Sequence, residues 1–317
     1  MSEFDLIRRY FTKSTPDALL GIGDDAALLM PSAGHALVVS SDMLVSGTHF
    51  FHDADPFMLG HKTLAVNLSD MAAMGAKPRW VTLAISLPEA DDAWLERFSA
   101  GFLSLAELHS VELVGGDTTR GPLNLSVTIL GEVPQGQSLL RSGAQAGDEI
   151  WVSGNLGDAA LALARMQENA TLNDAQFSAC SAALHQPQPR VELGLALRGI
   201  AKSAIDISDG LLADLRHILD ASNVGAQLNY SALPTSDVLR ELLPEPLGKQ
   251  CVLSGGDGYE LCFTADAESH EKISAVGVQL DLKLTCIGEI IEGQDCVVQD
   301  GAGINIDVKG AGYDHFR

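Results

Sequence analysis

The stretch from residue 56 to residue 74, PFMLGHKTLAVNLSDMAAM, is apolar on nearly every side and predicts a buried helix. Asp70 lies inside it, three residues after Asn67 and therefore on the same helical face. Buried aspartates are rare without a partner. A binding role is therefore favoured for Asp70, and a structurally paired aspartate is the alternative.

Around this helix, apolar runs and amphipathic stretches alternate in a way that is typical of α/β or α+β domains. Strands are predicted at 36–40, 80–87, 111–114, 123–133, 149–153, 204–207, 226–230, 252–253, 261–264 and 284–291, and further helices at 92–109, 157–168, 174–184, 189–202 and 210–221. A single core rarely grows beyond about 250–300 residues, so 317 residues favour two domains. The loop at 134–147, rich in Gly, Gln and Ser, places them at residues 1–137 and 138–317.

The charge balance excludes several partners. The chain has 20 basic and 42 acidic residues, whereas a nucleic acid or an anionic membrane needs a basic face. Neither a signal peptide nor an apolar stretch of about 20 residues is visible, so no membrane segment is expected. The five cysteines lack C-x-x-C spacing, which favours reduced thiols in a cytoplasmic protein over disulfides or a zinc site.

Common catalytic motifs are missing: no G-x-x-x-x-G-K-[ST], G-x-G-x-x-G, G-x-S-x-G or H-E-x-x-H occurs. Instead, Asp repeatedly stands beside Gly or Ser next to an apolar run. The six clusters are Gly21-Ile22-Gly23-Asp24-Asp25, Ser40-Ser41-Asp42, Asn67-Leu68-Ser69-Asp70, Gly115-Gly116-Asp117, Asp206-Ile207-Ser208-Asp209-Gly210 and Gly255-Gly256-Asp257. The fourth and last share an apolar run before Gly-Gly-Asp, an echo too short to establish a duplication.

Mg²⁺ prefers oxygen ligands and usually binds through a few carboxylates plus substrate phosphates. Glycine lets the backbone turn tightly and approach a ligand. Converging carboxylates repel one another unless cations lie between them. The pattern therefore favours a site with several Mg²⁺ ions.

Each cluster also has an ordinary structural explanation. Asp209 could cap a helix, and Asp42 or Asp117 could be turn residues. His49 could be a strand-edge residue, and Arg141 could be a phosphate clamp or a surface arginine. Tyr313 could stack on a ring or hold the C-terminus.

Taken together and in this order, the clusters resemble the thiamine-monophosphate kinase family, within the wider aminoimidazole ribonucleotide synthetase-like group. The resemblance runs from Gly21 to Phe316, and its most specific stretches are Gly21–Ala27, Ser41–Phe50, Asn67–Ala76, Gly115–Thr119 and Asp206–Leu211. It implies a two-domain fold whose N-terminal domain forms a homodimer through its sheet. It also implies ATP and thiamine monophosphate as substrates, with Mg²⁺ as cofactor.

The resemblance also implies residue roles. The Mg²⁺ ligands would be Asp25, Ser40, Ser41, Asp42, Asp70, Asp117, Asp206 and Asp209. ATP would contact Gly116, Asp117, Arg141 and Ser208, and thiamine monophosphate would contact His49, Asp257 and Tyr313. No catalytic base is expected, because the acceptor is itself a phosphate whose second pKa is about 6.

One departure concerns the substrate contact. The family pattern is Gly-Gly-Glu-Asp-Tyr-Glu-Leu, whereas this chain has Asp257 and Gly258 in the third and fourth positions. The change leaves a non-catalytic nucleotide or Mg²⁺ sensor open as an alternative. Other members of the group are disfavoured, because there is no N-terminal cysteine for selenophosphate synthesis and no C-terminal cysteine for hydrogenase maturation.

Overall fold

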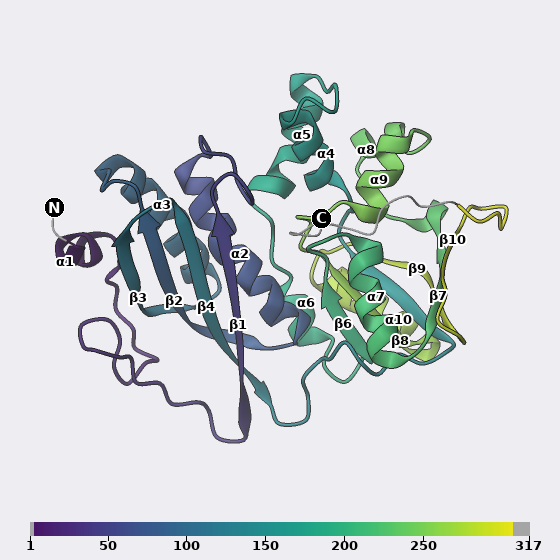
Figure 1. Cartoon of the computed structure of the whole chain (residues 1–317). Coiled ribbons are helices and arrows are strands. Elements are labelled where there is room, and N and C mark those ends of the chain that lie inside the picture. The colour runs from purple at the N-terminus through teal and green to yellow at the C-terminus, as the bar shows by residue number, and fades with distance from the viewer. Residues whose placement is uncertain (1–2, 307–317) are drawn as a thin grey trace. The chain divides into compact units, whose positions relative to one another are not determined.

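The computed structural model describes residues 3–306 and contains two separate sheets (Figure 1). The chain divides into two compact units, Met1–Met71 with Ala76–Gly136, and Ala72–Gly75 with Gln137–Arg317. The expected α/β class is confirmed. The division into domains at residues 1–137 and 138–317 stays a prediction. Within the described residues, no helix is both long and apolar enough to cross a membrane.

The first unit is a four-stranded sheet with helices. Its elements are α1 (Glu3–Leu6), the π-helical turn η1 (Ile7–Phe11), β1 (His35–Val45), α2 (Pro56–Ala73), β2 (Lys77–Leu87), α3 (Asp92–Leu108), β3 (Glu112–Arg120) and β4 (Asn124–Pro134). The strand order is β1-β4-β2-β3. β4 runs antiparallel to both β1 and β2, whereas β2 and β3 are parallel and are joined through α3. β1 and β3 are therefore the two edges of the sheet.

Helices α2 and α3 pack tightly on each other beside this sheet (Figure 1). Gly60 and Gly101 allow the approach, because a Cβ on either would clash with backbone of the other helix. Alternate β4 side chains, such as Leu125 and Ile129, are fully buried. On β1, Val39 and Met43 are instead 57% and 56% exposed, so part of this sheet is uncovered in the single chain.

The second unit is built on a six-stranded sheet in the order β10-β7-β9-β5-β8-β6. Its strands are β5 (Asp148–Ser153), β6 (Ser203–Asp206), β7 (Gly225–Asn229), β8 (Leu261–Asp266), β9 (Leu284–Ile291) and β10 (Cys296–Gln299). Its helices are α4 (Asp158–Met166), α5 (Asp174–His185), α6 (Val191–Ala196), α7 (Leu211–Ser222), α8 (Asp237–Leu242), α9 (Pro246–Ser254) and α10 (His270–Gln279), with 3₁₀ turns η2 (Tyr230–Ala232) and η3 (Ala267–Ser269). The buried core includes Ile150, Leu215 and Leu228.

Two local expectations were wrong. The strand predicted at 252–253 is the end of α9, which begins with Pro246 at its first turn, a position that suits proline. The helix predicted at 189–202 is confined to α6. Gly115-Gly116-Asp117 lies within β3, whereas Gly255-Gly256-Asp257 follows a helix, so the sequence echo is not a structural repeat.

Candidate active site

A carboxylate pair joins β1 to α2 in the first unit. The hydroxyl of Ser40 donates to Oδ2 of Asp70 at 2.5 Å, and the amide nitrogen of Asp42 donates to Oδ1 of Asn67 at 3.2 Å. Burial, and then the charge of Asp70, raise the pKa of Asp42 to about 6. We call Ser40, Asp42, Asn67 and Asp70 the β1–α2 cluster. A carboxyl group whose pKa is raised by a neighbouring carboxylate belongs to a site that favours a cation.

Backbone periodicity builds this cluster. Side chains two residues apart on a strand share a face, which brings Ser40 and Asp42 together. Ser41 points to the opposite face, where its hydroxyl donates to the carbonyl oxygen of Val127 at 2.9 Å. Ser41 can therefore approach the β1–α2 cluster only through its backbone atoms. Asn67 was not assigned a role from the sequence, although its helical spacing from Asp70 was visible.

A second acidic group lines a pocket of about 760 Å³ at the β3 edge. Asp25 and Asp24 reach it from the N-terminal loop, and Asp117 reaches it from β3. Gly116 lies beside them with φ +150°, and an added Cβ would clash with the carbonyl oxygen of Leu83. Apolar side chains, among them Phe4, Ile7 and Leu113, complete the wall. The pocket can therefore receive a ligand with an apolar and an anionic part if cations accompany it.

The two acidic groups of the first unit do not converge within one chain. Asp42 lies on β1 and Asp117 lies on β3, with β4 and β2 between them. Neighbouring strands are about 4.8 Å apart, so the two edges are separated by roughly 14 Å. Within residues 3–306, no three His, Cys, Asp or Glu side chains gather closely enough to hold a metal on their own. Mg²⁺ usually takes only one or two carboxylates plus phosphates, and the β1–α2 cluster fits that requirement.

His49 lies in the turn that follows β1. The amide nitrogen of Val45 donates to its Nδ1 at 3.0 Å, so the ring proton is placed on Nε2. This contact fixes the orientation of the ring and leaves Nε2 as its donor.

In the second unit, two loops form a small ladder that brings four predicted site residues together. Asp257 donates its amide to the carbonyl of Ser208 at 2.9 Å, and Tyr259 donates its amide to the carbonyl of Ile207 at 2.8 Å. Asp206 is the last residue of β6, and the loop after it carries Ser208 and Asp209, so Asp257 lies beside the end of this strand and its loop. Asp257 and Tyr259 have φ values of 63° and 51°, which are costly for non-glycine residues.

Asp214 supports this loop and was not predicted from the sequence. Its Oδ2 accepts the amides of Asp209 and Gly210 at 3.0 and 3.1 Å. Its side chain is buried, and burial raises its pKa to about 7 against the lowering effect of these hydrogen bonds. The sequence signal that could have identified Asp214 is its place in the first turn of α7, from which an acidic side chain can accept a hydrogen bond from the N-cap amide.

A buried ion pair holds the other loop. Arg190 donates from Nε and Nη2 to the two carboxylate oxygens of Glu260 at 2.7 and 2.5 Å, and the hydroxyl of Ser153 donates to the same carboxylate. The exposed fractions of the Arg190 and Glu260 side chains are 23% and 9%. The pair clamps the end of the strained Asp257–Tyr259 turn. The two residues are 70 positions apart, so no local pattern in the sequence could predict this ion pair.

Arg141 lies away from this ladder. The hydroxyl of Ser222 donates to its carbonyl oxygen at 3.4 Å, which places it near the last residue of α7. Ser208 precedes the first residue of that helix, and twelve helical residues span about 18 Å. The second unit therefore does not bring Arg141 and Ser208 together. Tyr313 lies outside the described residues.

Comparisons with known proteins identify the family of this chain. Residues 23–133 match the AIR synthase related protein, N-terminal domain, and residues 145–301 match its C-terminal domain. The thiamine-monophosphate kinase of Escherichia coli (strain K12) is 46% identical over 321 residues, 99% of this chain and 98% of the relative.

Two solved structures match nearly the whole fold. The crystal structure of the thiamine-monophosphate kinase from Stenotrophomonas maltophilia K279a has a TM-score of 0.86 and 52% identity, covering 93% of this chain and 94% of that one. A structure of AaThiL complexed with AMPPCP and TMP has a TM-score of 0.78 and 29% identity, covering 99% and 96%. The chain therefore belongs to the AIR synthase related proteins and, within them, to the thiamine-monophosphate kinase family.

Proposed function

We propose that the chain transfers a phosphoryl group from ATP to thiamine monophosphate, giving thiamine diphosphate and ADP. The observation that carries the proposal is the β1–α2 cluster, in which Asp42 and Asp70 face each other from a strand and a buried helix. Family membership supplies the substrate class, since the AaThiL structure holds AMPPCP, an ATP analogue, together with TMP.

The residues present fit Mg²⁺, because hydroxyl and carboxylate oxygens are its preferred donors. We assign Asp25, Ser40, Asp42, Asp70 and Asp117 of the first unit, with Asp206 and Asp209 of the second, to several such ions; Ser41 would take part through its carbonyl. When bound, Mg²⁺ neutralises the charges of the two phosphate groups that must meet. Gly116, Asp117, Arg141 and Ser208 would contact ATP, and His49, Asp257 and Tyr313 would contact thiamine monophosphate.

The acceptor needs no general base. Its phosphate is mostly dianionic at neutral pH, since the second pKa of a phosphate monoester is about 6. The protein's task is then to hold donor and acceptor in line, which favours direct transfer without a phosphorylated protein. A cytoplasmic setting is part of the proposal, since all five cysteines are free thiols and disulfides are rare in the cytosol.

We further propose a homodimer formed through the uncovered sheet face of the first unit. Leu37, Val39 and Met43 present 44%, 57% and 56% of their surfaces there. A twofold-related copy places the β3 edge of one subunit beside the β1 edge of the other. Such an arrangement would bring together the two acidic groups that one chain holds roughly 14 Å apart.

The assay is direct. Purified protein with ATP, Mg²⁺ and thiamine monophosphate should form thiamine diphosphate and ADP in equal amounts, measured by chromatography. Asp70→Asn should reduce the rate at least about a hundredfold, because it removes half of the carboxylate pair. Binding of Mg-ATP without turnover of any thiamine substrate would instead favour the sensor function that Asp257-Gly258 leaves open.

A further inference from the structure

The segment at residues 12–34, here called the strap, connects η1 to β1 and carries Asp24 and Asp25. It contains no helix and no strand beyond isolated bridges such as Leu20 to Leu28. Regular structure therefore cannot set the position of these two acids. Backbone hydrogen bonds between Leu20 and Leu28 close the tip, and side-chain contacts at the ends of the strap attach it to the sheet.

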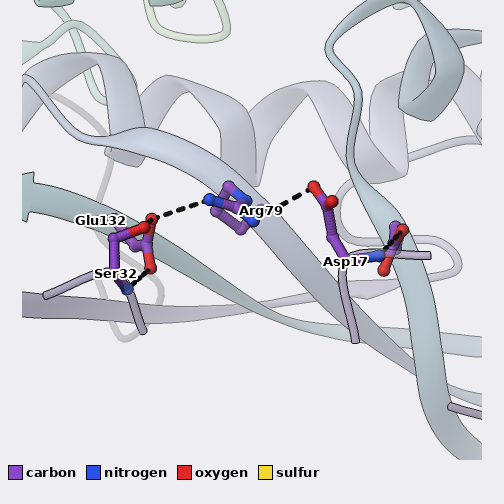
Figure 2. Close-up of polar contacts among 5 residues, drawn as sticks. Asp17, Ser32, Arg79 and Glu132 are labelled. Atoms are coloured by element: carbon purple, nitrogen blue, oxygen red, sulfur yellow. Dashed lines mark hydrogen bonds and ion pairs between the residues drawn. The ribbon is translucent and has the colours of Figure 1, made fainter. Parts of the chain in front are cut away.

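Arg79 of β2 and Glu132 of β4 form the centre of such a contact (Figure 2). Nη1 of Arg79 lies 2.9 Å from Oε2 of Glu132, and Nη2 lies 3.1 Å from Oδ2 of Asp17 in the strap. The register between β2 and β4 shifts at Arg79, which is a bulge that redirects its side chain. The guanidinium also lies 5.0 Å from the ring centre of Trp80.

The far end of the strap is fixed by the same carboxylate. Ser32 donates its amide to Oε1 of Glu132 at 2.6 Å and its hydroxyl to Oε2 at 3.0 Å (Figure 2). The near end has a further tie, because the amide of Asp17 donates to Oε1 of Glu112 on β3 at 2.7 Å. Sheet residues thus hold both ends of the strap, and the acidic tip lies between them.

Glu132 is suited to this task. Its side chain is 4% exposed, and burial alone would raise its pKa. Hydrogen bonds from Ser32 and the charge of Arg79 outweigh burial and hold the pKa below its usual value. The carboxylate therefore stays ionised at neutral pH. A buried charge of this kind is stable only while its partners remain in place. The contacts of Glu132 with Ser32 and Arg79 therefore hold the strap firmly.

We propose that Arg79 and Glu132 are positioning residues that hold the strap so that Asp25 meets Asp117 at the pocket. The proposal rests on the proposed function only in assigning Asp25 to Mg²⁺. Neither Arg79 nor Glu132 lines the pocket. They act by restricting the conformations of a segment that would otherwise lose its order, so that less entropy is lost on binding.

The test uses Arg79→Met, which keeps the aliphatic stem and removes both ion pairs. The first measurement is proteolysis of the full chain with a protease that cuts beside leucine, since Leu19 and Leu28 are 65% and 56% exposed. Cleavage within the strap should quicken about tenfold, because it follows the population of opened strap. Cleavage elsewhere should not change.

The second measurement is the Mg²⁺ concentration that gives half-maximal turnover. Arg79→Met should raise it about tenfold while leaving the KM for thiamine monophosphate at saturating Mg²⁺ unchanged. In an Asp25→Asn background the added effect of Arg79→Met should vanish, because the positioning acts through Asp25. Arg97→Met is the matched control, since it removes the exposed ion pair of Arg97 with Asp55 in the same unit.

Three results would overturn the proposal. The first is a released strap with an unchanged Mg²⁺ requirement, and the second is a strap cut no faster than in the wild type. The third is an equal effect of Arg79→Met with and without Asp25. If Arg79→Met does not fold, Asp17→Asn loosens the same contact from the exposed strap side and should shift both readouts less, in the same direction. If the wild type makes no thiamine diphosphate, Mg²⁺ titration calorimetry in the presence of ATP replaces turnover.

Discussion

The acidic residues of the β1–α2 cluster and those of the second unit are held in place by different means. In the first unit, Asp42 and Asp70 stand on a strand and a buried helix, whose periodicities alone bring them face to face. In the second unit, Asp209 and Asp257 stand on loops that depend on buried side chains, chiefly Glu260 with Arg190 and Asp214. A site on regular elements is sensitive to its own residues, whereas a site on loops is sensitive to residues behind it.

The sharpest way to break this comparison is Arg190→Met in the second unit. It leaves the Glu260 carboxylate buried without its guanidinium, which costs about 3 kcal/mol. Amide hydrogens around Ile207 and Tyr259 should then exchange about 100-fold faster by mass spectrometry, because local opening follows that free energy.

Arg240→Met is the control, since its pair with Asp237 is exposed and should contribute less than about 1 kcal/mol. Peptides of the first unit should keep their exchange rates in both variants. Equal, small effects of the two substitutions would mean that the Arg190 clamp does not hold the loop.

The pH dependence of stability and of Mg²⁺ affinity tests the first unit in this comparison. Asp42 has its pKa raised to about 6, so its ionised form is disfavoured in the metal-free fold. Its contribution to stability is therefore fully present below about pH 4 and is lost as pH rises to about 6, by up to about 3 kcal/mol. Mg²⁺ needs the ionised carboxylate, so Mg²⁺ affinity should fall as pH drops below about 6.

Thermal unfolding between pH 4 and 8, with and without Mg²⁺, measures both effects. Asp42→Asn should flatten the pH dependence of Mg²⁺ affinity. Asp214→Asn is the matched variant in the second unit, because Asp214 also has a raised pKa, about 7, yet is not a member of the β1–α2 cluster. If the pH dependence of Mg²⁺ affinity is the same in Asp42→Asn as in the wild type, the titrating group is not Asp42.

The smallest expected effect is that of Gly258→Asp. Gly258 is not in the left-handed region, and an added Cβ would have only the carbonyl oxygen of Ile207 as a neighbour, at 3.8 Å. Stability should change by less than about 0.5 kcal/mol. The new acid restores the family pattern beside Asp257, so the KM for thiamine monophosphate should change while the Mg²⁺ requirement does not. A change in both would mean that this turn also serves the metal.

The difference between the units also explains what the sequence could predict. Asp70 was found because helical spacing is a local pattern, whereas Asp42 was found as an acid beside serine at the end of a predicted strand and through the family resemblance. The length of β3 was underestimated, since Gly115 and Gly116 are poor strand residues, and pairing with β2 overrides that preference. The strand predicted at residues 252–253 missed the helix signal of Pro246.

Two ion pairs that hold loops in place could not be predicted from local sequence patterns. Arg79 and Glu132 are 53 residues apart, and Arg190 and Glu260 are 70 apart. Each pair looks like ordinary surface charge in the sequence. Only tertiary structure shows which carboxylates are buried and which arginine each one meets.

The strap contact with Glu132 has a consequence for synthesis on the ribosome. Ser32 precedes Glu132 by 100 residues, and β4, which carries Glu132, is also the strand that joins β1 to β2. Translation proceeds at about 5–20 residues per second, so the nascent chain carries its acidic tip unlocked for roughly 5–20 s. The contacts of Asp17 with Arg79 and Glu112 can form earlier, but the far end of the strap can be fastened, and the sheet completed, only when β4 emerges.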